Sequence, residues 1–405
     1  MFECTYSKYE NTITFIYKIT EQQQMVENKI KSCRTTYRLF FVILQSDKVL
    51  INNYLKTKKL MKHVYTSIFM LALLAISSNS FAQGPNNSGT YYQAADGKKG
   101  EALKTALCAI IYPRDEGGDL NTAYDALWTH FQTTDALPNG KVWDMYSNKR
   151  EMTFVVDQDP GKGNQEGQYY NREHSMPNSW FGKKVMPMYT DLHHMYPTDK
   201  VVNNKRSNYP FGETNGSWKS ANDFSKLGTC TYPGYSGTVF EPNDAYKGDF
   251  ARTYFYMITC YEEKLPDWYT NYGVNGSGDT KTAVLATLDG NTYPGLSTWQ
   301  LEMLMKWAKN DPVSADKETP RNNAVYTIQN NRNPFIDYPG LEEYIWGSMK
   351  DVAFSYDNYQ MPTAIITIQA ERSAKDGVMH NLAGQIVDKT YKGIVIMNGK
   401  KFMNK

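Results

Sequence analysis

Apolar residues recur at helical spacing in three stretches of the chain, residues 103–110, 124–131 and 250–261. Residues three and four apart lie on one face of a helix, so each stretch predicts a helix with one buried side. The apolar positions are Leu103, Leu107 and Ile110; Tyr124, Leu127, Trp128 and Phe131; and Phe250, Tyr254, Met257, Ile258 and Tyr261. We interpret these stripes as core, because a surface helix of a folded domain buries such a face.

The sequence also marks the ends of helices. Asp249 is a candidate N-cap for the third helix, because its carboxylate can accept hydrogen bonds from the first turn. Ser297 and Gln300 have the spacing of a capping box ahead of the apolar positions in 301–308. Asn310-Asp311-Pro312 is expected to end that helix, since the residue before a proline disfavours helical backbone.

Apolar residues at every second position predict strands in two further places. Met152, Phe154 and Val156 predict a strand, and a polar, Gly-rich loop follows at 157–167. In the tail, Ile365–Ile368 is a short β-branched run, and two turn signals follow it, Asp376-Gly377 and Asn398-Gly399; the second lies between Ile394–Ile396 and Lys401-Phe402. The chain is therefore predicted to be an α+β protein, with a helix-rich domain at 91–347 and a β-rich segment at 363–405.

The first 82 residues differ from the rest of the chain. Residues 1–60 contain no Gly, Ala or Pro, whereas the whole chain has 28 Gly and 17 Pro. We interpret them as upstream sequence translated from too early a start codon, or as an unstructured extension. Residues 61–82 have the pattern of a secretory signal: nearby lysines, an apolar stretch at Ile68–Ile76, and Ser80-Phe81-Ala82 ahead of a cleavage site before Gln83. A secreted protein is therefore expected, and a buried core helix is the alternative.

Composition narrows the classes of protein. A hydrophobic fraction of 41% with 21% charged residues predicts a folded core, and a net charge of +2 gives no global basic excess. The cysteines are Cys4, Cys33, Cys108, Cys230 and Cys260, and none has metal-binding Cys-x-x-Cys spacing. One disulfide among the last three is an option, and the sequence does not choose the pair.

Three polar clusters carry the candidate chemistry: residues 171–177, 191–197 and 203–209. Phosphodiester hydrolysis needs a base for water, a cation, and positive groups that hold the backbone, and these clusters contain such groups. Imidazole suits the base, and Glu and Asn oxygens suit a hard divalent cation.

Strand geometry restricts how the groups meet. Adjacent side chains of a regular strand point to opposite faces, so Glu173 and His174 converge only at a strand end or bend. Asp199 or Thr198 is expected to cap a following helix, which would place Asn203 one turn in. The expected unit is strand, strand, helix.

The run Tyr170-Asn171-Arg172-Glu173-His174, with Asp191-Leu192-His193, Val202-Asn203 and Arg206-Ser207-Asn208 after it, resembles the endonuclease I family of His-Me finger (ββα-metal) nucleases. Trp143-Asp144-Met145-Tyr146, Phe240–Asp244 and Asn331–Asp337 are also similar to its members. The resemblance covers about residues 91–347 and implies a ββα-metal core embedded in helices.

The resemblance implies roles for three residues. His174 matches the general base, and Glu173 and Asn203 match ligands of Mg²⁺, with Ca²⁺ or Mn²⁺ as alternatives. The implied reaction is largely sequence-nonspecific cleavage of DNA, with RNA as an alternative, leaving 5′-phosphate ends. Because a protonated imidazole cannot accept a proton, the rate is expected to fall on acidification near the ordinary histidine pKa of about 6.5.

Other candidates have competing interpretations. Arg206 is a phosphate contact or forms a structural ion pair with a carboxylate such as Asp244. Lys183 and Lys184 occupy a stretch where some relatives carry a longer insertion with a phosphate-binding arginine, and either lysine is a candidate substitute. Asp191 orients the base or caps a turn. Of the adjacent pair His193 and His194, the core-facing one is expected to bond to backbone and support the site.

Two rival functions and one targeting signal remain. A secreted zinc hydrolase, such as a peptidase, would use His174, His193 and Asp191, although the helical His-Glu-x-x-His signature is absent from the sequence. A non-catalytic surface module is the second rival. Residues 363–405 resemble the C-terminal sorting domains of type IX secretion, which predicts export through the periplasm; a hairpin that caps the nuclease domain is the alternative.

Overall fold

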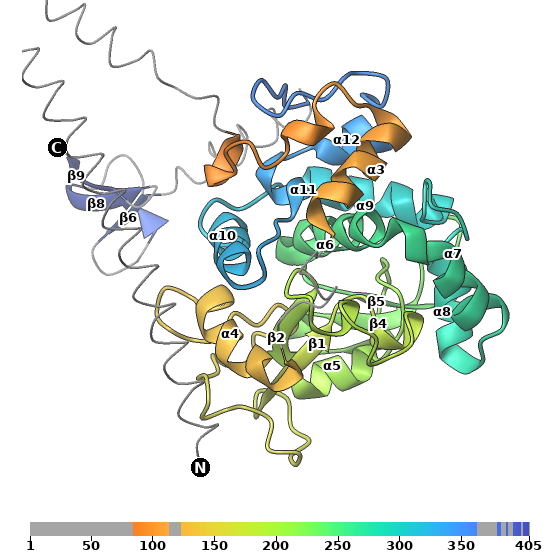
Figure 1. Ribbon diagram of the computed structural model, residues 1–405. Coiled ribbons are helices and arrows are strands. Elements are labelled where there is room, and N and C mark those ends of the chain that lie inside the picture. The colour runs from red at the N-terminus through yellow and green to blue at the C-terminus, as the bar shows by residue number, and fades with distance from the viewer. Residues whose placement is uncertain are drawn as a thin grey trace, which may run out of the picture. The chain divides into compact units, whose positions relative to one another are not determined.

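The computed structural model describes residues 84–112 and 123–362, and in the tail 379–381, 386–387, 392–397 and 400–404. Helices and small antiparallel sheets build this part of the chain, which confirms the predicted α+β class (Figure 1). The interpretations of residues 1–60 and of the signal at 61–82 concern residues outside the described ones. The same holds for Ile365–Ile368 and Asp376-Gly377.

The elements alternate between helices and short strands. The helices are α3 (Gly100–Ile111), α4 (Leu127–Thr134), α5 (Lys200–Arg206), α6 (Lys247–Cys260), α7 (Leu265–Trp268), α8 (Gly278–Thr287), α9 (Thr298–Asn310), α10 (Glu318–Gln329), α11 (Pro334–Asp337) and α12 (Leu341–Ile345). The strands are β1 (Tyr170–His174), β2 (Met195–Asp199), β3 (Trp218–Lys219), β4 (Lys226–Thr229) and β5 (Thr238–Glu241), then β6 (Met379–Asn381), β7 (Ile386–Val387), β8 (Gly393–Met397) and β9 (Lys400–Asn404) in the tail.

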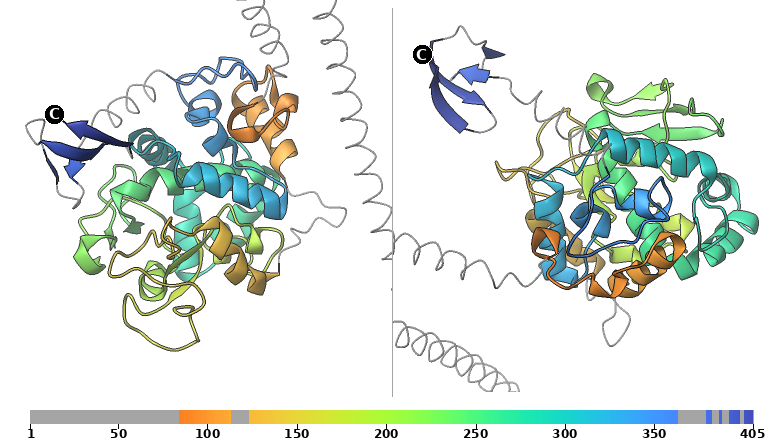
Figure 2. Two further views of the ribbon diagram at one scale, coloured as in Figure 1. Left: turned by 90° about the vertical axis from the view of Figure 1, so that its left-hand side faces the viewer. Right: turned by 90° about the horizontal axis from the view of Figure 1, so that it is seen from above.

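Helix α6 is the centre of the helical part. Every residue from Gly248 to Cys260 is buried, and the helix packs against α3 and α9. Its polar Arg252 is neutralised inside the core by Glu318, with Nη2 and Oε2 2.8 Å apart. Figures 1 and 2 show α3, α9 and α12 on one side of the body and β1, β2 and α5 on the other.

Strands β1 and β2 with helix α5 form the predicted strand–strand–helix unit. The two strands are antiparallel, with Glu173 opposite Tyr196 and His174 opposite Met195. The last residue of β2, Asp199, caps α5 as predicted: its Oδ1 accepts from the backbone N–H groups of Val201 and Val202 at 2.8 and 3.0 Å. This cap fixes where the helix begins relative to the strands.

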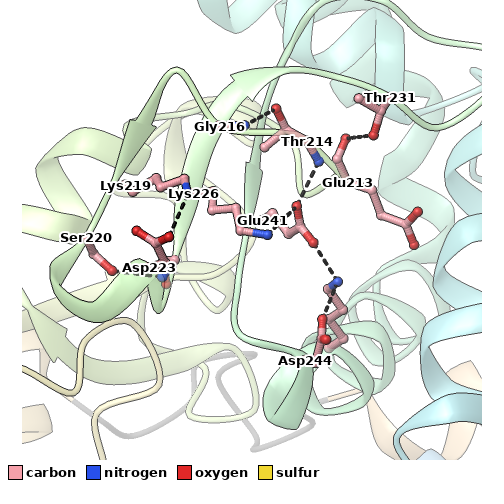
Figure 3. Close-up of polar contacts among 12 residues, drawn as sticks. Glu213, Thr214, Gly216, Lys219, Ser220, Asp223, Lys226, Thr231, Glu241 and Asp244 are labelled. Atoms are coloured by element: carbon pink, nitrogen blue, oxygen red, sulfur yellow. Dashed lines mark hydrogen bonds and ion pairs between the residues drawn. The ribbon is translucent and has the colours of Figure 1, made fainter.

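A second, three-stranded antiparallel sheet has the order β3-β4-β5. Glu241 at the end of β5 accepts from the backbone N–H of Thr214 at 2.8 Å and pairs with Lys247 at the start of α6 (Figure 3). These contacts join the sheet to the central helix.

The predicted strand at 152–156 is wrong. Thr153 makes only an isolated bridge, to Lys141, and the chain then turns. The Asp157 carboxylate accepts from the Thr153 N–H at 2.7 Å, and the Val156 N–H donates to the Phe154 carbonyl at 2.8 Å. These local bonds replace the bonds of a strand ladder, and Val156 is 74% exposed.

Two predicted helix caps also differ from the structure. Helix α6 begins at Lys247, so Asp249 lies inside its first turn, buried and 3.8 Å from Arg252, and does not cap it. Ser297 does precede α9, but its hydroxyl donates to the carbonyl of Ala286 at 2.6 Å and makes no capping bond. The predicted end of α9 at Asn310 is confirmed.

The three cysteines of the described chain are free, buried thiols. Cys108 and Cys260 instead donate to backbone carbonyls, Cys108 to that of Cys260 and Cys260 to that of Ile111. The disulfide that the sequence left open is therefore not formed among Cys108, Cys230 and Cys260.

The described part of the tail forms a four-stranded antiparallel sheet in the order β7-β6-β8-β9. Ile396 pairs with Lys401, which confirms the hairpin predicted around Asn398-Gly399. Among the described residues, no helix has the length and hydropathy of a membrane span.

Candidate active site

The end of β1 places Glu173 and His174 on opposite faces of the strand. Side chains alternate along a regular strand, so Tyr170, Arg172 and His174 share one face and Glu173 points to the other. The two candidate groups therefore lie on two sides of the strand end and not side by side.

Glu173 is buried and held on one oxygen. Its Oε1 accepts from the Tyr146 hydroxyl at 2.8 Å and from Arg206 Nη1 at 3.1 Å. Burial raises the pKa of Glu173 to about 7, against the opposing effects of the Arg206 charge and the Tyr146 hydrogen bond. Arg206 and Tyr146 therefore offset only part of the cost of burying the ionised form of Glu173.

Arg206 lies in the interior and not at a surface where phosphate could reach it. Its side chain is 1% exposed, pairs with Glu173, and also donates to the backbone carbonyls of His174 and Ser175. The structure thus favours the ion-pair interpretation over the phosphate contact. The partner differs from the one suggested, because Asp244 pairs with Lys247 at 2.6 Å in the cluster around Glu241 (Figure 3).

His174 is oriented by a backbone carbonyl. Its Nε2 lies 2.9 Å from the carbonyl oxygen of Tyr189, which can only accept, so Nε2 carries the ring proton. The Nδ1 lone pair is then the basic site of the neutral ring. Burial, with His194 nearby, lowers the pKa of His174 to about 3, so the ring is neutral at pH 7.

Asn203 lies on helix α5, which also carries Arg206, the partner of Glu173. It precedes Arg206 by three residues, and residues three apart are neighbours on a helix surface. Asn203 is partly exposed, and its side chain makes no hydrogen bond within the described chain. Its amide oxygen is therefore free to take a ligand.

The residues present fit a hard divalent cation. The hydrogen bonds of Glu173 within the described residues fall on Oε1 and leave Oε2 without a protein donor. A carboxylate oxygen with the free amide oxygen of Asn203 suits Mg²⁺, which keeps most of its waters and takes few protein ligands. In the described chain no three His, Cys, Asp or Glu side chains gather as a metal cage, which is the arrangement a zinc hydrolase would need.

Asp191 accepts four hydrogen bonds in the interior next to the site. Its Oδ2 accepts from the hydroxyls of Tyr256 and Tyr261 at 2.8 and 2.6 Å, and its Oδ1 from Gln329 and from the backbone N–H of His193. Burial would raise its pKa, but the neighbouring histidines and these hydrogen bonds lower it below the ordinary range. Asp191 holds the turn that leads into β2.

His193 and His194 lie in that turn, before β2 begins, and both are buried. We expected one to face the core and the other to face away, as in a strand. Instead each ring bonds a backbone carbonyl, His193 that of Asn331 at 3.2 Å and His194 that of Met188 at 2.6 Å. Both rings are 1% exposed or less, so they lie in the interior and hold the turn.

Lys183 and Lys184 are exposed and form no ion pair with the described residues. They follow Phe181, whose ring centroid lies 6.3 Å from that of His174. Both lysines are thus exposed on the segment that follows Phe181.

The sequence analysis did not identify two residues that contact the candidate groups, Tyr146 and Tyr189. Tyr146 bonds Glu173, although only its stretch, Trp143–Tyr146, had been noted as similar to the family. Tyr189 orients His174 through its main chain, and a backbone carbonyl leaves no signal in the choice of residue.

Comparison with known proteins agrees with the geometry. Residues 99–340 match the family described as Endonuclease I. The chain is 34% identical over 265 residues to an extracellular ribonuclease of Bacillus amyloliquefaciens, covering 64% of this chain and 78% of the relative. It is 33% identical over 267 residues to the extracellular ribonuclease of Bacillus subtilis (strain 168), covering 64% and 79%. An Endonuclease-1 of Buchnera aphidicola subsp. Baizongia pistaciae is 26% identical over 148 residues, covering 36% and 46%.

Proposed function

Because this chain belongs to the endonuclease I family, we propose that it is a metal-dependent endonuclease that hydrolyses phosphodiester bonds within DNA or RNA. The observation that carries the proposal is the end of β1, where a neutral His174 and a buried Glu173 lie on two sides of one strand and α5 adds Asn203. The relatives named extracellular ribonucleases support cleavage of RNA, and the name Endonuclease-1 supports cleavage within a nucleic-acid chain.

His174 supplies the base. Its Nδ1 accepts a proton from water as the water oxygen bonds to phosphorus, and the P–O3′ bond breaks. The Tyr189 carbonyl holds the Nε2–H and stabilises the imidazolium that forms. The products are a 5′-phosphate and a 3′-hydroxyl, whose proton comes from solvent.

Glu173 and Asn203 hold the cation, and Arg206 and Tyr146 hold Glu173. When bound there, Mg²⁺ supplies positive charge to the phosphate and to the departing oxygen. Ca²⁺ and Mn²⁺ are the alternatives. Lys183 and Lys184 contact flanking phosphates, which carry no base information, so cleavage is largely independent of sequence.

Export is part of the proposal. The relatives named extracellular ribonucleases and the signal-like pattern at 61–82 support a secreted enzyme. The exported protein should begin at Gln83, and N-terminal sequencing tests this. An exported chain that retains residues 1–60 contradicts it.

The enzymatic proposal is tested by incubating the purified secreted protein with plasmid DNA and with RNA, first with EDTA and then with excess Mg²⁺. We expect no cleavage with the chelator, recovery with Mg²⁺, and ends that are ligatable as 5′-phosphates. Cleavage that persists in EDTA contradicts the metal dependence. Recovery by Zn²⁺ alone, together with peptide hydrolysis, would favour the zinc hydrolase, and a protein inert under all conditions would favour the non-catalytic module.

A further inference from the structure

Two tyrosines stack beside the general base. Tyr189 is nearly parallel to His174 (centroids 5.2 Å apart, planes at 18°) and to Tyr124 (4.3 Å, 18°). Tyr124 and His174 are themselves nearly parallel, at 6.1 Å and 12°. The three rings therefore share one orientation, with Tyr189 close to both of the others.

These tyrosines differ from the others around the site in their exposure. Tyr146, Tyr254 and Tyr256 are fully buried, and each hydroxyl bonds a core group. Tyr124 and Tyr189 are only partly buried, so their rings reach solvent next to a base that is itself 8% exposed. Core packing accounts for the first set and for Tyr124, which packs against the cluster of Leu127 and Phe131. Tyr189 packs against none of the core clusters of the described chain.

A cation adjoins the rings. Arg172 lies two residues before His174 on the same face of β1, with its guanidinium carbon 3.6 Å from the Tyr124 centroid and 4.4 Å from that of Trp128. It donates to the Tyr124 carbonyl and to Asp125, whose side chain is 92% exposed. Arg172 thus covers one face of the Tyr124 ring and Tyr189 lies over the other. Tyr189 is the outer ring of this stack, since its ring contacts in the described chain are those with Tyr124 and His174.

Aromatic ring faces next to positive charge are features by which proteins hold single-stranded nucleic acid. Each base offers two flat faces, and stacking on a protein ring contributes regardless of base identity. In a duplex the neighbouring bases cover these faces, so such a surface favours unpaired nucleotides.

We propose that the outer face of Tyr189, supported from behind by Tyr124 and Arg172, is a stacking subsite for an unpaired nucleobase next to the scissile phosphate, so that the enzyme prefers single-stranded over duplex nucleic acid. The inference rests on the proposed nuclease function and adds its substrate class. It concerns the side chain of Tyr189, whereas the orientation of His174 uses only the backbone carbonyl of that residue.

The test compares kcat/KM of the secreted protein on a single-stranded oligonucleotide, on its duplex, and on the same single strand with abasic residues. We expect the wild type to cleave the intact single strand at least about tenfold better than the other two. Loss of one stacked base corresponds to a fall of about five- to 150-fold. Tyr189→Leu and Tyr124→Leu should each lower single-strand cleavage within that range and lower duplex cleavage much less.

Tyr326→Leu is the matched control. Tyr326 is also half-buried, with the Arg332 guanidinium carbon 5.3 Å from its ring centroid, but its ring contact is with Tyr91 and not with His174. It should leave the single-strand preference unchanged. Binding of oligothymidine in EDTA, which needs no catalysis, should weaken in the Leu variants of Tyr189 and Tyr124 and not in the control.

Equal cleavage of single strand and duplex by the wild type overturns the inference and leaves the nuclease function standing. An equal loss on both substrates in Tyr189→Leu, with oligothymidine binding intact, also overturns it, because the ring would then only support His174. A wild type that cleaves no nucleic acid removes the proposed function itself.

Discussion

Burial separates the behaviour of two neighbouring titratable residues. His174 loses solvation and becomes harder to protonate, with its pKa lowered to about 3. Glu173 loses solvation too, and for a carboxyl the same cause raises the pKa, to about 7. At pH 7 the His174 ring is therefore neutral. The Glu173 carboxyl is close to its pKa, so binding of a cation would shift it to the ionised form.

This difference predicts an acid limb that depends on magnesium. A carboxyl is charged above its pKa, so as pH falls below about 7 Glu173 protonates and loses its affinity for the cation. The magnesium concentration for half-maximal rate should rise about tenfold per pH unit below that point, because proton and cation compete. Rates measured between pH 5 and 8 at several magnesium concentrations test this. An acid limb fixed near pH 6.5 at every concentration would instead assign it to His174.

Residue identities at the site follow from the sequence, but their environments do not. Glu173, His174 and Asn203 stand in a recognisable pattern. The sequence suggested an ordinary imidazole pKa, because burial depends on Tyr189 and Phe181, which pack over His174 from another segment. The ion pair of Arg206 was among the interpretations, but its partner was not predicted for the same reason, because Glu173 lies 33 residues away on β1.

At the scale of elements, local signals were predictable and distant ones were not. Asp199 caps α5 through bonds to the N–H groups two and three residues on, and such a cap is visible in the sequence. The turn at 154–157 was mistaken for a strand because its apolar residues alternate. The Asp157 carboxylate closes the turn by accepting from the Thr153 N–H, and an aspartate after an apolar run does not by itself predict that bond.

Helix α10 ties the turn before β2 to the rest of the body through Arg321. The guanidinium pairs with buried Asp135 at 2.7 Å and donates to the carbonyls of Leu192 and Met195, both at 2.8 Å. Arg321→Met leaves a buried carboxylate and two carbonyls without their donor. It should cost about 3–5 kcal/mol in the free energy of unfolding, measured by urea denaturation.

The double variant Arg321→Met with Asp135→Leu is the control for that prediction, since it removes the orphaned charge as well. It should recover part of the loss. A single variant that loses less than about 1 kcal/mol would show that the pair behaves as an exposed ion pair.

At the scale of the whole molecule, the residues of the candidate site all lie within 84–362, and the tail strands form a sheet among themselves. The tail hairpin was predictable because Asn-Gly between apolar runs specifies one, and β8 pairs with β9 accordingly. The order of the four tail strands was not predictable, since it depends on pairing across longer loops.

Deleting residues 363–405 should therefore leave nuclease activity of the purified enzyme unchanged while blocking export, as expected of a sorting segment. Activity per milligram and the secreted fraction are the two measurements, and the full chain is the control. A deletion variant that no longer folds would show that the tail caps the nuclease domain instead.

In the proposed mechanism His174 acts on water, whereas Glu173 and Asn203 act through a cation. The most direct measurement is nucleic-acid cleavage against magnesium concentration for the wild type, His174→Ala, Glu173→Gln and Asn203→Ala, with thermal unfolding to show that each variant is folded. His174→Ala should lose about 10²–10⁴-fold in rate at every concentration, with an unchanged magnesium midpoint. The other two should raise the midpoint and recover in part at high magnesium. Near wild-type cleavage by His174→Ala, or a magnesium midpoint that none of the variants moves, would contradict the account.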